Sequence, residues 1–170
     1  MGQLNLGNGA DFIGGSGGYL SDAPKGSILK FAYASSSSSQ DLGSTYSFTD
    51  LTGLSINYTP ASSTSELYIT ADIMAYYRGT SSYYGFLDLQ ILHDGSTVNA
   101  EKFTEYRNYG GTSSYTMYSG LTHFVGTNNA SNTSARIIKV QVKNENNSNA
   151  GLIINNYSGK SFLSVWEVAG

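Results

Sequence analysis

The sequence contains no cysteine, few charged residues and no long apolar run. Without cysteine the chain can form neither disulfides nor thiolate metal sites, so its stability has to come from packing or from association between copies. Charged residues make up 12% of the chain, about half the usual share. The formal net charge of −3 argues against broad electrostatic binding of nucleic acid or of an anionic membrane. No apolar stretch approaches the ~20 residues of a spanning helix, so membrane insertion is not expected.

In place of charge the chain has 20 glycines, 14 tyrosines and many small polar residues. Such a composition predicts a polar, weakly charged surface rather than disorder, because disordered chains usually combine high net charge with few aromatic residues. A length of 170 residues suits one domain with a short extension.

Residues 1–25 are rich in glycine and carry only scattered apolar side chains. Glycine makes an independent helix or strand costly, because it loses the most backbone freedom on folding. We expect an extended arm that becomes ordered against a partner or a neighbouring copy; a flexible tail is the alternative.

Apolar and polar residues alternate in most of the remaining chain, which is typical of half-buried β-strands. The longest such strand is predicted over 66–77, and Asp94-Gly95 predicts a tight hairpin turn. The last ten residues also alternate and contain the only tryptophan. We expect this last strand to be central in its sheet and to bury Trp166. Eight to ten short strands and no amphipathic helix predict an all-β sandwich or barrel.

Four short segments carry a resemblance to a known family. They are 26–30 (Gly-Ser-Ile-Leu-Lys), 52–69 (beginning Thr-Gly-Leu-Ser-Ile-Asn-Tyr-Thr-Pro), 92–96 (Leu-His-Asp-Gly-Ser) and 162–170 (Phe-Leu-Ser-Val-Trp-Glu-Val-Ala-Gly). Together they resemble a C-terminal domain of tail-fibre-like proteins of tailed bacteriophages, especially marine and cyanobacterial phages. The resemblance implies that 26–170 form a jelly-roll-like antiparallel β-sandwich, and that the protein is a homotrimer on the virion surface.

Two regions rich in tyrosine and arginine are the candidate binding sites. The residues are Tyr76, Tyr77, Arg78, Tyr83, Tyr84, Tyr106, Arg107 and Tyr109. Tyrosine offers a rigid ring with a polar tip, and the surrounding serines and glycines let loops adapt to a partner. These residues therefore suit a host glycan or receptor, although the same side chains are also enriched at contacts between subunits.

Catalytic chemistry has little support in the sequence. His93 and His123 are the only histidines, and neither has a recognisable constellation of catalytic partners around it in the sequence. The carboxylates that a glycosidase would need have no distinctive spacing, and we expect each of them to be solvated: Asp72, Asp88, Glu101 and Glu105. No metal-ligand spacing is recognisable. We therefore expect no catalytic residue, no metal, no cofactor and no enzymatic activity.

These observations favour a structural protein of the virion surface, a trimeric fibre or knob that attaches to a host glycan or surface protein. Residues 1–25 would anchor it to other virion proteins. One alternative is a capsid decoration (cement) protein that stabilises the head. An alternative of another class is a carbohydrate-binding lectin or a polysaccharide-degrading enzyme.

Overall fold

The computed structural model describes residues 4–5, 11–12, 23–43, 46–79, 83–108, 118–146 and 150–170. Every regular element in these residues is a β-strand. The strands are β1 (Leu4–Asn5), β2 (Asp11–Phe12), β3 (Ile28–Ser36), β4 (Gln40–Gly43), β5 (Thr49–Tyr58), β6 (Glu66–Gly79), β7 (Tyr83–His93), β8 (Ser96–Asn108), β9 (Tyr118–Asn129), β10 (Arg136–Asn146), β11 (Ala150–Ile154) and β12 (Ser161–Val168). The two short strands β1 and β2 pair only with each other.

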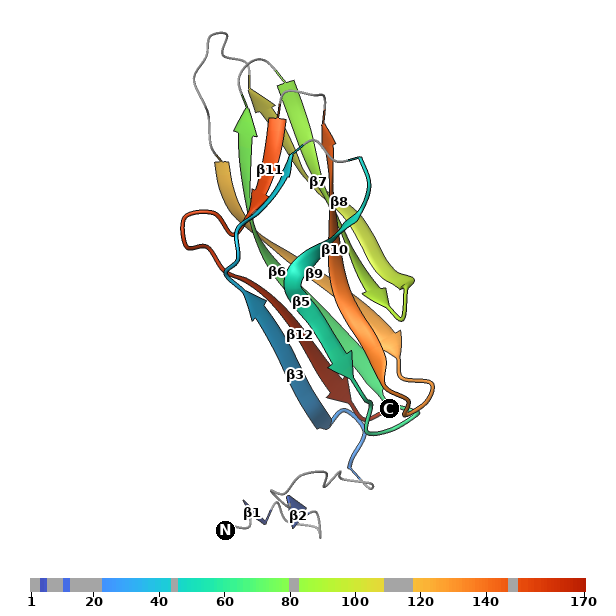
Figure 1. Cartoon of the computed structure of the whole chain (residues 1–170). Helices are drawn as coiled ribbons and strands as arrows, with labels where there is room; N and C mark the ends of the chain where they lie inside the picture. The colour runs from blue at the N-terminus through green and yellow to red at the C-terminus, as the bar shows by residue number, and fades with distance from the viewer. Residues whose placement is uncertain are drawn as a thin grey trace.

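The main domain is a sandwich of two antiparallel sheets (Figure 1). One sheet has the order β5-β10-β7-β8. The other has the order β3-β12-β6, with β9 on the far edge of β6 and β11 and β4 at one end. From β4 onward the chain crosses between the two sheets at every connection except β7 to β8 and β11 to β12. This is the strand order of a jelly roll, so the predicted all-β, jelly-roll-like sandwich is confirmed.

Strand β6 is the longest of the second sheet and organises it. One edge of β6 pairs with β9 along almost its whole length. The other edge pairs first with β12, from Glu66 to Asp72, and then with β11, from Ala75 to Gly79. At the changeover the Ser161 hydroxyl accepts a hydrogen bond from the Met74 N–H at 2.9 Å and donates one to Asn155 Oδ1 at 2.6 Å. Polar side chains thus satisfy the backbone where one partner strand replaces the other.

The core lies between the sheets and is formed by alternate residues of each strand. Leu67, Ile69 and Ile73 of β6 face Leu87, Leu89 and Ile91 of β7 across it, all essentially inaccessible to solvent. This alternation is the one predicted from the sequence. The predicted Asp94-Gly95 turn is also confirmed: both residues have positive φ, 50° and 79°, as a two-residue hairpin loop requires.

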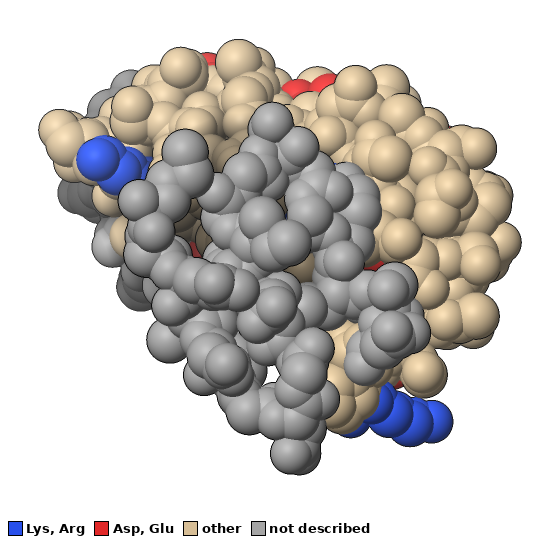
Figure 2. All heavy atoms as spheres, turned by 90° about the horizontal axis from the view of Figure 1, so that it is seen from below, with Lys and Arg blue, Asp and Glu red and all other residues tan. Residues whose placement is uncertain are grey.

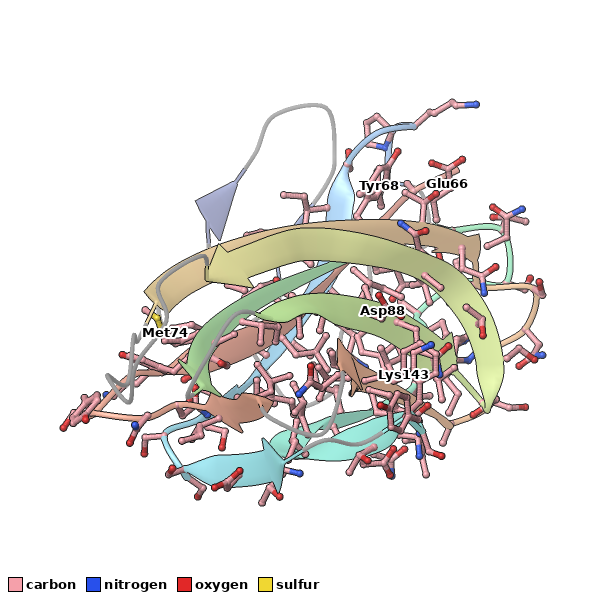
Figure 3. The ribbon with its side chains drawn as sticks, turned by 90° about the horizontal axis from the view of Figure 1, so that it is seen from above. Glu66, Tyr68, Met74, Asp88 and Lys143 are labelled. Atoms are coloured by element: carbon pink, nitrogen blue, oxygen red, sulfur yellow. The ribbon has the colours of Figure 1, made fainter. Side chains whose placement is uncertain are left out.

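Two burial predictions are wrong. Strand β12 is central, between β3 and β6, but Trp166 lies on its outer face with 39% of its surface exposed. The inward positions of this strand belong to Leu163, Val165 and Glu167. Asp88 was expected to be solvated but is buried, because Lys143 on the neighbouring strand β10 pairs with it at 3.0 Å (Figure 3).

The chain enters the sandwich beside its own last residues. The Gly26 N–H donates to the Ala169 carbonyl, and the Ala169 N–H donates to the Ser27 carbonyl, at 2.9 and 2.8 Å. Residues 1–25 therefore join the domain at the end of the sandwich where β12 finishes, which we call the arm end. Whether they dock on a partner stays a prediction.

Candidate functional site

The outer face of the β3-β12-β6 sheet carries a cluster of exposed apolar side chains, which we call the aromatic face. It consists of Ile28, Phe31, Tyr33, Tyr68, Phe162 and Trp166, each between 38% and 67% exposed. Alternation directs every second residue of a strand to the same side, and the antiparallel register aligns these positions across the three strands. Ile28 joins them through a register shift, which sets it opposite Val168 although it is three residues before Phe31.

The register places the rings in rows across the sheet. Trp166 stands opposite Phe31 on one side and Tyr68 on the other. The Phe31 and Trp166 ring centroids are 4.3 Å apart at an interplanar angle of 45°, and Phe31 also stacks with Tyr33 at 6.0 Å. In the next row Ser164 is hydrogen-bonded to Thr70 between their hydroxyls at 2.6 Å. The centre of the aromatic face is therefore small and polar, with large rings around it.

Carboxylates border the aromatic face along β6. The Tyr68 hydroxyl donates to Glu66 Oε2 at 2.8 Å, and the two side chains lie side by side on the outside of the sheet (Figure 3). This hydrogen bond, with the negative charge of Glu66, raises the pKa of Tyr68. Asp72 lies opposite Phe162 in the register.

The aromatic face is large for the surface of a monomer. A fully exposed aromatic side chain presents about 200 Å². The exposed fractions of the six residues then leave roughly 500 Å² of apolar surface open to solvent, near the upper end of the largest patch found on typical monomers.

The outer face of the other sheet is different, because polar side chains form a chain of hydrogen bonds across it. Asp50 on β5 accepts from Lys139 Nζ at 2.8 Å and from Gln141 Nε2 at 2.6 Å on β10. Gln141 accepts in turn from Gln90 on β7 at 2.6 Å. The bond from Lys139 is the main cause that holds the pKa of Asp50 below its usual value. Ile137 is the exposed large apolar residue of β10 on this face. The two outer faces are therefore suited to different surroundings, water for one and an apolar partner for the other.

The tyrosine-rich residues predicted as binding sites fall at the end of the sandwich opposite the arm end. Tyr76, Tyr77 and Arg78 lie in β6, Tyr83 and Tyr84 in β7, and Tyr106 and Arg107 in β8, whereas Tyr109 lies outside the described residues. The register sets Tyr84 opposite Arg107, so the structure brings part of the two regions together on neighbouring strands. Tyr77 and Arg78 belong to the other sheet, where they pair with β11.

Among these residues, the structure describes the side chain of Tyr76. It is half-buried and meets Tyr157 edge-on, with ring centroids 5.9 Å apart. Tyr157 is itself 72% exposed on the loop between β11 and β12. Binding by this end of the molecule stays a prediction.

Glu167 is a buried carboxylate that the sequence did not indicate. It accepts hydrogen bonds from the Tyr58 hydroxyl at 2.8 Å, the Ser65 hydroxyl at 2.5 Å and the backbone N–H groups of Ala61 and Ser62 at 2.8 and 3.0 Å. Burial alone would raise the pKa of Glu167, but these donors outweigh it and the pKa lies below its usual value of 4.5. The carboxylate thereby holds the loop between β5 and β6 against the arm end.

Two of the residues considered for catalysis, His93 and Asp88, are engaged in structural contacts, and the side chains of His123 and Glu101 lie outside the described residues. The two ring nitrogens of His93 are within 2.9 Å of Arg136 and Asn128, and Asp88 is paired with Lys143. Among the described residues no three metal-ligating side chains gather in one place. Nor does the described part of the chain contain a helix that could cross a membrane.

Comparison with known proteins gives a likeness of structure but not of sequence. No family model and no curated protein matches the chain. A VP2 subviral particle of infectious bursal disease virus matches with a TM-score of 0.41 and 15% identity, over 83% of this chain and 37% of the viral one. The structure of the Gx strain of the same virus matches with a TM-score of 0.40 and 17% identity, over 85% and 39% of the two chains. The chain thus spans less than two fifths of either viral chain.

Proposed function

We propose that this protein is a structural component of a virion and that it works as a homotrimer joined through the aromatic face. The observation that carries the proposal is the contrast between the two outer faces of the sandwich. One is a hydrogen-bonded polar surface and the other exposes six large apolar side chains.

The open apolar area fits an interface between subunits. A stable interface takes about 800 Å² from each partner. The aromatic face supplies more than half of that, and its carboxylate and hydroxyl border resembles the polar rim of such interfaces. Covering it would also offset the absence of disulfides, because association stabilises the folded state by mass action.

A virion is the setting that best fits these features. Jelly rolls of two antiparallel sheets are common in viral capsids and in lectins. The segments at 26–30, 52–69, 92–96 and 162–170 resemble phage tail-fibre-like proteins, which implies a surface location and a trimer. Charged side chains are sparse on the described surface seen from below (Figure 2), so contacts with other virion proteins would be mainly uncharged.

The two ends of the sandwich suggest how the protein is oriented on the particle. Strand β6 runs from Glu66, which pairs with Val168 near the arm end, to Tyr76, Tyr77 and Arg78 at the other (Figure 1). An arm bound to the particle would leave the tyrosine-rich end facing outward. In this arrangement Tyr83, Tyr84 and Arg107 would contact a host glycan or surface protein, and three weak sites per trimer would act together.

Localisation on particles tests the proposal. Virions carrying the protein would be imaged by electron microscopy, and density for a three-fold knob of this fold is expected at the particle surface. A position at the tail supports host attachment, whereas a position spread over the head supports the cement alternative. Absence of the chain from purified particles would refute a virion role.

Carbohydrate binding without a virion is the second candidate function, and one observation favours it. Trp166 is exposed beside the hydroxyl pair of Ser164 and Thr70. Sugars stack their C–H faces on aromatic rings and use hydroxyls as hydrogen-bond partners. Tryptophan fluorescence decides between the two: a shift on addition of oligosaccharide supports the lectin function, and a blue-shifted, iodide-protected emission that reddens on dilution supports the subunit interface.

A further inference from the structure

A histidine, an arginine and an asparagine from three strands meet at the arm end. His93 ends β7, Arg136 begins β10, and Asn128 lies near the end of β9 in the opposite sheet. His93 Nε2 is 2.9 Å from Arg136 Nη1, and His93 Nδ1 is 2.8 Å from the Asn128 side-chain amide. We propose that His93 is a pH-sensitive latch, which holds the segment 128–136 at neutral pH and releases it in mild acid. This inference rests on the described contacts and not on the proposed function.

Arg136 determines the shape of the segment. Its guanidinium is buried and donates to the Ala130 carbonyl at 2.6 Å, to the Asn132 carbonyl at 2.7 Å and to Asn132 Oδ1 at 2.8 Å. A further bond reaches the Ser134 carbonyl. The loop between β9 and β10 is therefore wrapped around a single side chain, and any displacement of the guanidinium must disturb it.

The hydrogen-bond chemistry fixes the protonation state of His93. A guanidinium has only donors, so His93 Nε2 must present its lone pair to Arg136. The ring is then neutral with its hydrogen on Nδ1. That hydrogen requires an acceptor, so the Asn128 amide, which is assigned with Nδ2 at 2.8 Å from Nδ1, must be turned to present its oxygen to the ring. The nitrogen and oxygen of an amide are assigned from the hydrogen bonds they make.

Protonation of His93 breaks this arrangement. The added proton on Nε2 points at Arg136, so a donor faces a donor and two positively charged groups are in contact, with Nε2 and Nη1 2.9 Å apart. One of the two side chains has to move. Arg136 can move only by giving up carbonyls of the loop, and His93 only by giving up Asn128, which joins β7 to the other sheet.

The charges around the ring favour release on the acid side of neutrality. Burial and the positive charge of Arg136 lower the pKa of His93 from 6.5, against the opposing effect of Asp94 in the adjacent turn. The unfolded or opened state therefore binds the proton more readily than the closed state. Neutral His93 stabilises the closed conformation of the 128–136 segment fully above pH 6.5. This stabilisation is lost as the pH falls toward the lower pKa that His93 has in the folded protein. Glu167 remains ionised in this range, because its own pKa lies below 4.5.

The latch acts where the arm joins the domain. The Ala130 N–H donates to the Ser65 carbonyl at 2.8 Å, and Ser65 also binds Glu167. Release of the 128–136 segment would thus loosen the loops next to the Gly26–Ala169 pairing, while the core between the sheets stays closed.

Hydrogen exchange of the full-length protein tests the latch. Protection factors for residues 128–136, relative to those of β6, would be measured between pH 7.5 and 5.0. We expect them to fall below pH 6.5, approaching tenfold per pH unit. His93→Gln keeps an acceptor and a donor but cannot be charged, so it should remove the fall. His123→Gln, at the other histidine, should leave it in place.

Equal pH profiles for the wild type and His93→Gln would overturn the proposal, and so would a loss of pH dependence in His123→Gln. If His93→Gln does not fold, NMR of the wild-type ring decides. The proposal requires the Nδ1–H tautomer at pH 7.5 and a titration midpoint below 6.5; a midpoint at or above 6.5 contradicts it.

Discussion

At the scale of single residues, Glu167 illustrates how one buried charge can fix a loop. Its carboxylate accepts from two backbone N–H groups and two hydroxyls, and together these bonds compensate for the loss of water. The alternation of the last strand puts position 167 on the same side as Leu163 and Val165, and the structure shows that this side, not the Trp166 side, faces the core. A carboxylate at such a position is unexpected, because the donors that satisfy it come from the distant segment 58–65.

Replacing Glu167 by glutamine should destabilise the domain by about 2–4 kcal/mol, because the amide group turns an N–H toward donors and the charge-assisted bonds are lost. Urea unfolding monitored by circular dichroism measures this. Glu66→Gln, on the exposed outer face, is the matched control and should change stability by less than about 0.5 kcal/mol. Equal effects of the two substitutions would contradict the role assigned to Glu167.

Glu167 also predicts a pH dependence of stability. Its pKa is lowered in the folded protein, so its contribution is complete above pH 4.5 and is lost as the pH falls below that value. The wild type should therefore lose stability more steeply than Glu167→Gln between pH 4.5 and 3. Parallel stability profiles would show that other carboxylates dominate acid unfolding.

At the scale of strands, the local sequence patterns predicted the strands themselves better than the places where one strand replaces another beside β6. The alternation in β6 and β12 and the Asp94-Gly95 turn are visible within a few residues of sequence. The changeover from β12 to β11 is not, because it depends on Met74, Asn155 and Ser161 meeting across the fold. The loop between these strands also holds Asn155, Tyr157 and Ser158 at positive φ, a conformation that Asn tolerates but that Tyr and Ser rarely adopt.

Removing the Ser161 hydroxyl tests the junction. Ser161→Ala leaves the Met74 N–H and Asn155 Oδ1 without this partner in a fully buried position, so a loss of about 1–3 kcal/mol is expected. Ser35→Ala on the exposed face of β3 is the control, and thermal unfolding gives both values. A loss no larger than the control's would show that the hydroxyl bond does not support the changeover.

At the scale of the whole molecule, the main surprise is where the apolar surface lies. The sequence put Phe162 and Trp166 on one side of the last strand. The aromatic residues on that side gave no sign that it faces solvent. The aromatic face appears only when β3, β12 and β6 are set in register, because Phe31, Tyr68 and Trp166 are far apart in the chain. The tyrosine-rich regions predicted as sites are a separate feature at one end of the sandwich.

Deletion of residues 1–25 tests the role of the arm. The remaining chain keeps both sheets and the full core, so it should unfold cooperatively and form the same oligomer as the intact protein. It should no longer be incorporated into particles, as measured by co-sedimentation with virions. A truncated protein that does not fold would place the arm within the core instead.

The central claim is that the aromatic face joins three copies, and the mass of the full-length protein in solution tests it most directly. Sedimentation equilibrium at micromolar concentration should give three times the chain mass of 18.2 kDa. Trp166→Ser should reduce it to the mass of a folded monomer, because the substitution removes the ring that lies between Phe31 and Tyr68 without touching the core. Ile137→Ser, at an exposed apolar position on the opposite sheet, should remain trimeric. A wild-type protein that stays monomeric throughout the micromolar range would contradict the account.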